Sequence, residues 1–258
     1  MEFRPCIDIH NGKVKQIVGT SLREGSSASA LKENFVSEKN ASYYAALYRD
    51  KGLLGGHVIL LDPEEKKTRE QALLALQAYP SGLQAGGGIT PENAAVFLDA
   101  GASHVIVTSY VFREGRIDYD RLRELAKSVG REHLVLDMSC KKKEKGYVVV
   151  TDRWQRETAE LVDERLFAGL SEYCDEFLIH AVDVEGKAAG IDEELVTLLG
   201  NAATRPMTYA GGVRSIEDLA LLQKLGQGRV NVTIGSALDL FGGSLAFEEA
   251  ARFCKTAR

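Results

Sequence analysis

Short apolar runs alternate with amphipathic stretches along the whole sequence. Eight runs are rich in Val, Ile and Leu without polar alternation, which is typical of strands covered on both faces. They span residues 4–9, 57–61, 82–85, 104–108, 133–138, 176–180, 206–210 and 229–234. Stretches with helical spacing follow them, over residues 41–51, 68–79, 91–100, 118–129, 158–168, 192–199, 215–225 and 246–256. Eight successive strand–helix units predict an α/β fold, either a barrel or a doubly wound sheet.

An internal repeat favours the barrel over the doubly wound sheet. The sequence LQAGGGIT at residues 83–90 is echoed by MTYAGGVR at 207–214, Asp8 by Asp137, and Asp62 by Asp183. Strands one to four therefore repeat as strands five to eight, and such a repeat closes naturally as an eight-stranded barrel. We expect a single TIM barrel of eight parallel strands over residues 1–258, made of two half-barrels of about residues 1–130 and 131–258.

The composition is ordinary for a globular protein and excludes two classes of partner. With 27% charged residues and a net charge of −5, the chain lacks the basic field that nucleic-acid binding needs. No apolar run approaches the roughly 20 residues of a membrane span. The one basic run, KKKEK at residues 141–145, predicts a solvated hairpin or loop, or alternatively a lysine that reaches an anionic substrate.

The cysteines, the histidines and the N-terminus bear on compartment and metal binding. Cys6, Cys140, Cys174 and Cys254 show no CxxC spacing, which predicts reduced thiols in a cytosol-like compartment. The N-terminal sequence enters a strand almost at once and leaves no room for a signal or transit peptide, so we expect a cytoplasmic protein. No histidine pair has metal-ligand spacing, so we expect no metal.

Aspartates stand at the carboxyl ends of several predicted strands, where the active site of a TIM barrel lies. Asp8 and Asp137 come from strands one and five, on opposite sides of the barrel mouth. A substrate between them meets one carboxyl on each face, which suits an acid and a base that act on different atoms. Strand-end aspartates also cap loops or pair with lysines, but the echo between these two favours catalysis.

Glycine-rich turns at the strand ends predict phosphate binding. A strand that runs into Gly-Gly and then a helix exposes backbone N–H groups to an anion. The sequence has two such turns, one in each half, and each is expected to form a phosphate-binding cup. Two matching cups predict a substrate with a phosphate at each end, spanning the barrel mouth. The cup residues are Gly87, Gly88, Thr108 and Ser109 in one half, and Gly211, Gly212, Gly235 and Ser236 in the other.

Aromatic and imidazole side chains are the remaining candidates for the site. Trp154, the sole tryptophan, lies among charged residues after strand five, which favours stacking on a flat substrate group over anchoring a loop. His57, His104 and His133 start strands and are expected to be structural, at the barrel bottom. His180 lies near a strand top within reach of substrate, although a lone histidine is more often a structural hydrogen-bonding residue.

Several segments together resemble a known family. They are CIDIHNGKVKQ at residues 6–16, VLD at 135–137, VTDRWQ at 150–155, VDVEG at 182–186, YAGGV at 209–213 and VTIGSALD at 232–239. They resemble the barrel isomerase of histidine biosynthesis, phosphoribosylformimino-aminoimidazole carboxamide ribotide (ProFAR) isomerase, over nearly the whole chain. The string His-Asn-Gly-x-Val-Lys-Gln and the Val-Asp-Val-Glu-Gly loop are most similar to the branch found in fungi and plants.

The resemblance implies an Amadori rearrangement of an aminoaldose to an aminoketose, without a cofactor. It implies that Asp8 is the base that takes the proton from ribose C2, and that Asp137 is the acid that opens the furanose ring. Members of this family are often monomers, and no uninterrupted apolar stripe demands a partner. We therefore expect a monomer that binds a small bis-phosphorylated substrate.

The sequence departs from many bacterial members of the family. Gln16 and Thr90 stand where those proteins have arginine, and the sixth loop, residues 180–186, differs from theirs in sequence and length. Some bacterial relatives place the general acid in that loop. Asp183 and Glu185 are therefore alternatives to Asp137 as the acid, and Asp183 is also a candidate for binding the substrate. The repeat favours Asp137.

Other functions stay open at this point. The sister barrel that cyclises the reaction product with ammonia shares the repeat, the cups and both aspartates, but residues 11–16 and the tryptophan loop resemble the isomerase better. A sugar-phosphate binder without turnover is a second alternative, and an isomerase that also accepts phosphoribosyl anthranilate is a third. Residues 21–38, a polar stretch with Gly and Ser, are expected either to close over the substrate or to form an inert solvated insertion.

Overall fold

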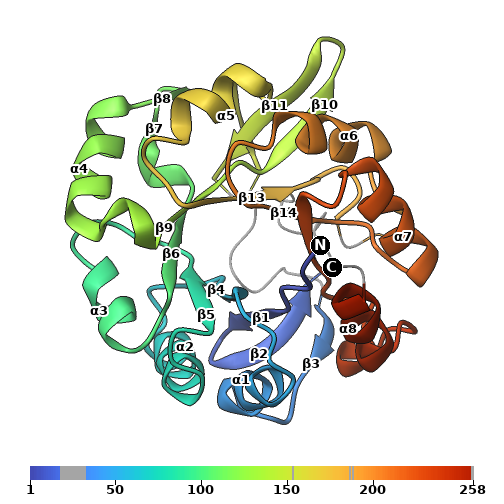
Figure 1. Ribbon diagram of the computed structural model, residues 1–258. Helices are drawn as coiled ribbons and strands as arrows, with labels where there is room; N and C mark the ends of the chain where they lie inside the picture. The colour runs from blue at the N-terminus through green and yellow to red at the C-terminus, as the bar shows by residue number, and fades with distance from the viewer. Residues whose placement is uncertain (18–32, 153, 186, 188, 257–258) are drawn as a thin grey trace.

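The computed structural model describes residues 1–17, 33–152, 154–185, 187 and 189–256 and confirms the predicted barrel. Within these residues, eight parallel strands form a ring surrounded by helices (Figure 1). Each strand pairs with the next around the ring. In order they are β1 (Cys6–His10), β4 (Gly56–Leu60), β5 (Leu83–Gly86), β6 (His104–Val107), β9 (Leu134–Asp137), β13 (Glu176–His180), β14 (Met207–Ala210) and β15 (Val230–Thr233). The ring closes where the Arg4 N–H donates to the Val232 carbonyl at 2.8 Å.

Eight helices cover the outer face of the ring in the part of the chain that the structure describes. They are α1 (Ala41–Asp50), α2 (Lys66–Ala78), α3 (Ala94–Asp99), α4 (Tyr119–Val129), α5 (Glu164–Leu170), α6 (Glu193–Ala202), α7 (Ile216–Leu225) and α8 (Phe247–Thr256). Side chains cap several first turns by accepting a backbone N–H. These caps are Asn40, Asp118, Asp163, Asp192 and Ser215. Each of these helices therefore begins directly after a residue whose side chain accepts a hydrogen bond from a backbone N–H of the first turn.

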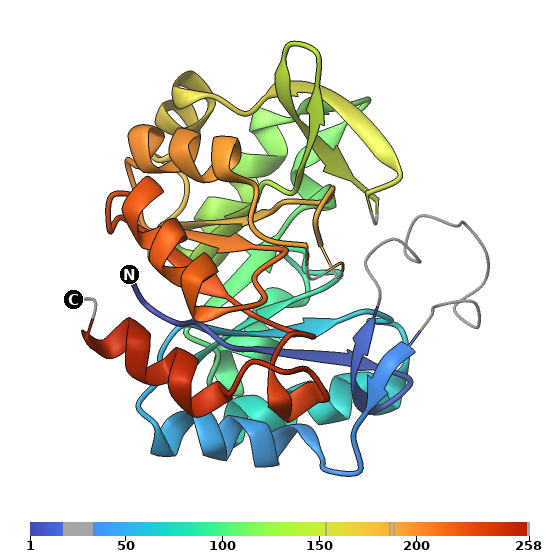
Figure 2. The same cartoon turned by 90° about the vertical axis from the view of Figure 1, so that its right-hand side faces the viewer.

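Three small groups of strands lie outside the ring. β2 (Lys13–Ile17) and β3 (Glu33–Val36) continue from β1 as antiparallel strands. β10 (Cys140–Lys143), β11 (Gly146–Thr151) and β12 (Arg156–Leu161) form an antiparallel sheet after β9, whose first hairpin projects from the barrel (Figure 2). β7 (Phe112–Arg113) and β8 (Arg116–Ile117) form a short hairpin.

The β10–β12 sheet tests two predictions made from the sequence. The lysine run at 141–145 lies in the projecting hairpin, where Lys141 and Lys143 pair with Glu157, so the hairpin alternative is confirmed. The helix predicted over residues 158–168 is wrong in its first part. Arg156–Leu161 is strand β12, in which Thr158 is buried between exposed neighbours, and the helix begins only at Glu164.

The barrel interior is apolar at its middle level. Ile106, Val135, Leu178 and Ala210 form one buried cluster, and Ile59 packs against it. These side chains come from five different strands and fill the ring as a solid core. The interior therefore separates the mouth of the barrel from its opposite end.

A buried ion pair between Arg4 and Glu176 closes the end of the barrel where the strands begin. The N-terminus and the last turn of α8 lie on this side of the barrel (Figure 2). Glu176 is 3% exposed. Its carboxylate accepts hydrogen bonds from Arg4, from Gln84 Nε2 at 2.9 Å and from Thr208 Oγ1 at 2.7 Å. Because these partners come from different parts of the ring, the network ties the ring together at this end.

We expect Glu176→Ala to lower the free energy of unfolding by about 3–5 kcal/mol, because it removes the buried counter-charge of Arg4. Urea denaturation followed by circular dichroism measures this loss. Arg123→Ala is the control, since its ion pair with Asp120 is exposed, and we expect it to change stability by less than about 1 kcal/mol. Equal losses in the two variants would show that the buried network does not stabilise the barrel.

Candidate active site

Two adjoining cavities open at the carboxyl ends of the barrel strands. Both are lined by Asp8 of β1, Gln16 of β2, Ile59 of β4, His180 of β13 and Glu185 of the turn that follows β13. One cavity extends toward β5 and β6, and the other extends toward β14 and β15. The five shared residues therefore lie at the centre of the barrel mouth, between the two half-barrels.

The predicted phosphate cups line these cavities, one cup in each. The first cavity is lined by Gly87, Gly88, Thr108 and Ser109. The second cavity is lined by Gly211, Gly212, Gly235 and Ser236. The repeat in the sequence thus becomes two equivalent turns on opposite sides of the mouth. Each turn offers backbone N–H groups and a hydroxyl to an anion.

Glycine is required in both turns for steric reasons. Gly87 has a φ of +103°, and a Cβ there would lie 2.1 Å from the Leu60 carbonyl oxygen. Gly212 has a φ of +74°, and a Cβ there would lie 2.0 Å from the Gly190 carbonyl oxygen. The close approach of backbone to backbone therefore excludes any side chain at either position.

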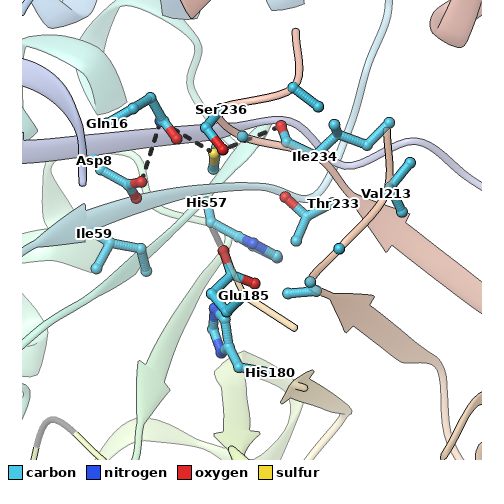
Figure 3. Close-up of a pocket in the computed structure, with 16 residues that line it drawn as sticks. Asp8, Gln16, His57, Ile59, His180, Glu185, Val213, Thr233, Ile234 and Ser236 are labelled. Atoms are coloured by element: carbon cyan, nitrogen blue, oxygen red, sulfur yellow. Dashed lines mark hydrogen bonds between the residues drawn. The ribbon is translucent and has the colours of Figure 1, made fainter. Parts of the chain in front are cut away.

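Asp8 is a carboxyl group held partly protonated near neutral pH. Burial and the nearby Glu185 raise its pKa, whereas His180 and a hydrogen bond from Gln16 lower it, and the net result is a pKa of about 7. The Gln16 Nε2 donates to Asp8 Oδ2 at 3.2 Å (Figure 3). A carboxyl group with such a pKa is suited to exchange a proton with a substrate at neutral pH.

Asp137 is held in its ionised form. Burial alone would raise its pKa, but His180 and hydrogen bonds from Ser139 together lower it. The Ser139 N–H and hydroxyl donate to Asp137 Oδ1 at 2.8 and 2.7 Å. His180 Nδ1 lies 3.5 Å from the same oxygen, and despite burial the Asp137 charge raises the pKa of His180 to about 9. Asp137 and His180 therefore form an ion pair at neutral pH.

Glu185 lines the same cavity as His180 and His57 (Figure 3). Burial raises the pKa of its carboxyl, and the His180 charge opposes this rise. Its Oε2 is buried and accepts no hydrogen bond from the residues that the structure describes. His57 also lines the cavity, and burial and Arg4 lower its pKa to about 3, so this imidazole is neutral. Glu185 is thus a buried carboxyl with a free oxygen at the site.

Trp154 lies at the outer side of the first cavity. It follows β11 and lines this cavity together with Asp137 and His180. The centres of the Trp154 and His180 rings are 6.0 Å apart. The indole is therefore placed where a flat substrate group that enters the first cavity would contact it.

Asp183 and Asp62, echoed in the sequence, are not among the residues that line the two cavities. Asp183 Oδ2 accepts the Lys142 N–H at 2.8 Å, and Asp62 Oδ2 accepts the Asn11 N–H at 2.8 Å. Each aspartate thus holds the segment that follows the first strand of its own half-barrel. This role fits the alternative in which strand-end aspartates fix loops.

Gln16 and His180 are site residues to which the sequence assigned no chemistry. A glutamine in an antiparallel strand and a single histidine give no signal by themselves. The echo of Asp8 by Asp137 offered one indirect clue, because a residue that lies beside either carboxyl lies in the site. Of the segment 21–38, expected either to close over the substrate or to form an inert solvated insertion, residues 21–32 lie outside the described residues.

Comparison with known proteins identifies the family of this chain. A family model described as histidine biosynthesis protein matches residues 2–245. A Medicago truncatula protein, named a chloroplastic phosphoribosyl imidazole-4-carboxamide isomerase, is 53% identical over 96% of this chain and 80% of its own length. Isomerases of the same name from Yarrowia lipolytica and Saccharomyces cerevisiae are 48% and 43% identical, over 94% and 98% of this chain and 93% and 97% of their own lengths. The chain therefore belongs to the histidine biosynthesis protein family.

Proposed function

We propose that this protein is a ProFAR isomerase, which converts the aminoaldose ProFAR to the aminoketose PRFAR by acid–base catalysis. The observation that carries the proposal is a site in which two glycine cups flank two half-buried carboxyl groups, Asp8 and Glu185. Two cups fit a substrate with a phosphate at each end, and the carboxyls meet the sugar between them. The isomerase names of the fungal and plant relatives support the same function.

The rearrangement needs an acid at the ring oxygen of the ribosylamine and a base at its C2. Glu185 suits the acid, because burial raises the pKa of its carboxyl and so favours the protonated form. That proton goes to the ring oxygen as the bond from C1 to this oxygen breaks, which leaves an open-chain iminium. Asp8 then takes the proton from C2, and an enolamine forms. The enolamine becomes the ketone when C1 gains a proton and the C2 hydroxyl loses one.

Asp137 suits the acid less well than Glu185 does. Its pKa is lowered, so it holds no proton to donate at neutral pH. We propose instead that Asp137 keeps His180 charged and fixed beside the substrate. We therefore propose that the acid lies in the sixth loop, and that it is Glu185 rather than Asp183.

The two cavities also suggest how the substrate lies in the mouth. Asp8 and Glu185 line both cavities, whereas Trp154 lines only the one that contains Gly87. We propose that the imidazole stacks on Trp154 with its phosphate at the first cup. The ribose that rearranges then lies over Asp8 and Glu185, with its phosphate at the second cup.

The test is turnover of ProFAR by the purified protein, followed by the absorbance change from aldose to ketose. We expect conversion to PRFAR without ammonia. Consumption of PRFAR with added ammonia, and none of ProFAR, would instead identify the cyclase. Tight binding of ProFAR without conversion would identify a binding protein. A parallel sample with phosphoribosyl anthranilate determines whether the site accepts a substrate with a single phosphate.

We expect Gly212→Ala to raise KM for ProFAR by about 10-fold or more, because the added methyl group pushes the second cup away from the Gly190 carbonyl. Steady-state kinetics at several substrate concentrations measure this rise. Gly228→Ala is the matched control, since Gly228 also has a positive φ of +67° but has no atom within 4 Å of the added Cβ. An unchanged KM in Gly212→Ala would mean that this turn does not hold a phosphate.

Oligomeric state and location stay proposals. We propose a monomer in the cytoplasm, whereas the name of the Medicago relative places that protein in the chloroplast. Across the described ranges, no helix is both long and apolar enough to cross a membrane. All four cysteines are buried and free, as the absence of a pairing pattern predicted.

A further inference from the structure

Gln16 occupies the centre of the site without a role in the chemistry above. It comes from β2, is 4% exposed and lines both cavities. Its Nε2 donates to Asp8 Oδ2 at 3.2 Å and lies 3.8 Å from Cys6 Sγ (Figure 3). Its Oε1 lies against the second cup, since a Cβ on Gly235 would be 2.4 Å from it. Gln16 thus lies between the base and the phosphate cup.

We propose that Gln16 is a positioning residue that orients Asp8 for proton abstraction, an inference that rests on the isomerase function and on Asp8 as the base. The amide holds one carboxylate oxygen, Oδ2, and so leaves Oδ1 to face C2 of the ribose. Proton transfer needs this alignment, because the base must lie within hydrogen-bonding reach of the proton it takes. A carboxylate without the amide contact is free to rotate.

The same hydrogen bond sets how much of Asp8 is ionised. The titratable groups that interact with Asp8 are Cys6 on its own strand, Tyr48 of α1, His180 of β13 and Glu185 after it. Ile59 of β4 and Thr233 of β15, which line the cavity from the neighbouring strands, carry no charge. Burial and Glu185 favour the protonated form of Asp8, and the Gln16 amide favours the ionised form because a carboxylate accepts its N–H.

An amide affects Asp8 differently from a cation at this position. A lysine or arginine in contact with Asp8 would lower its pKa strongly and so make it a weaker base. A cation here would also be buried beside the cup, at a cost in desolvation. The neutral amide orients Asp8 and leaves its pKa at about 7.

The test is Gln16→Met, which keeps the length of the side chain and removes the donor. In the pH profile of kcat/KM, we expect the rising limb on the acid side to move to higher pH by about 0.5–1 unit. The reason is that Asp8 loses a hydrogen bond to its ionised form. We expect kcat near neutral pH to fall about 10-fold, with KM changed less than about threefold. The isotope effect with ProFAR deuterated at C2 should increase, because proton abstraction becomes slower.

Gln84→Met is the matched control. It also removes a buried amide donor to a carboxylate, that of Glu176 at the closed end of the barrel, and lines neither cavity. We expect it to lower stability without moving the acid limb. If Gln16→Met does not fold, Gln16→Glu keeps the shape of the side chain, and its added charge should move the limb still further upward.

Two results would overturn the proposal. One is an acid limb that stays in place in Gln16→Met, and the other is an effect on KM alone. If the wild-type protein does not convert ProFAR, the proposed function itself fails. Carboxyl ¹³C NMR of Asp8 then still tests the contact, because an equal Asp8 pKa in wild type and Gln16→Met would exclude an influence of Gln16 on this carboxyl.

Discussion

We expect Asp8→Asn to lower kcat for ProFAR by about 10²–10⁴-fold, because an amide cannot accept the proton from C2. The wild-type kcat/KM should rise as pH increases through about 7, since Asp8 must lose its proton to act as a base. Rate measurements between about pH 5 and 9 give this limb directly. The variant should bind substrate with a similar affinity, because the cups are intact.

The same substitution should make the protein more stable in mildly alkaline solution. Folding raises the pKa of Asp8 from 3.8 to about 7, so its contribution to stability is present at low pH and is lost as pH rises through about 7. The asparagine side chain of the variant carries no charge to bury. We expect the variant to exceed wild type by about 1–2 kcal/mol near pH 8 in urea denaturation. Activity retained in Asp8→Asn would exclude Asp8 as the base.

We expect Glu185→Gln to lower kcat by about 10²–10⁴-fold, because the amide cannot protonate the ring oxygen. Asp137→Asn should have a smaller effect, about 10–10²-fold, because it removes the partner of His180 and not the donated proton. The pKa of His180 should then fall from about 9, and ¹⁵N NMR of the imidazole measures this fall.

Comparison of the two variants distinguishes the alternatives for the acid. If Asp137→Asn loses far more activity than Glu185→Gln, Asp137 is the acid, as the repeat in the sequence favoured. Asp183→Asn is a suitable control, since this aspartate lines neither cavity and accepts a backbone N–H from Lys142. We expect its activity to be within about threefold of wild type.

The barrel could be predicted from the sequence because its strands are buried on both faces. Each of the eight strands is short, mostly apolar and almost wholly buried, and the four-unit repeat favours a closed ring over an open sheet. The strands outside the ring have a weaker pattern of apolar residues in the sequence. β12, for example, alternates charged residues with the buried Thr158, and its sequence RETAEL also has good helix formers. Burial against β11 decides its conformation.

The candidate site could be predicted only in part. Asp8, Asp137 and the glycine cups were found because their positions at strand ends are fixed by the barrel topology. The roles of Gln16, His180 and Glu185 depend on their partners across the mouth. His180 lies 3.5 Å from Asp137, a residue 43 positions away in the chain, and no local pattern encodes this distance. Such contacts between distant residues set the pKa of each carboxyl and so decide which one keeps its proton.

The sole tryptophan gives the protein an intrinsic optical probe of its own mouth. Trp154 lies 6.0 Å from the protonated ring of His180, and a charged imidazole at this distance quenches indole fluorescence. A ligand that stacks a flat group on the indole changes this quenching. Because no second indole contributes to the emission, binding constants and stopped-flow association rates can be recorded on the unlabelled protein, including variants that have lost all turnover.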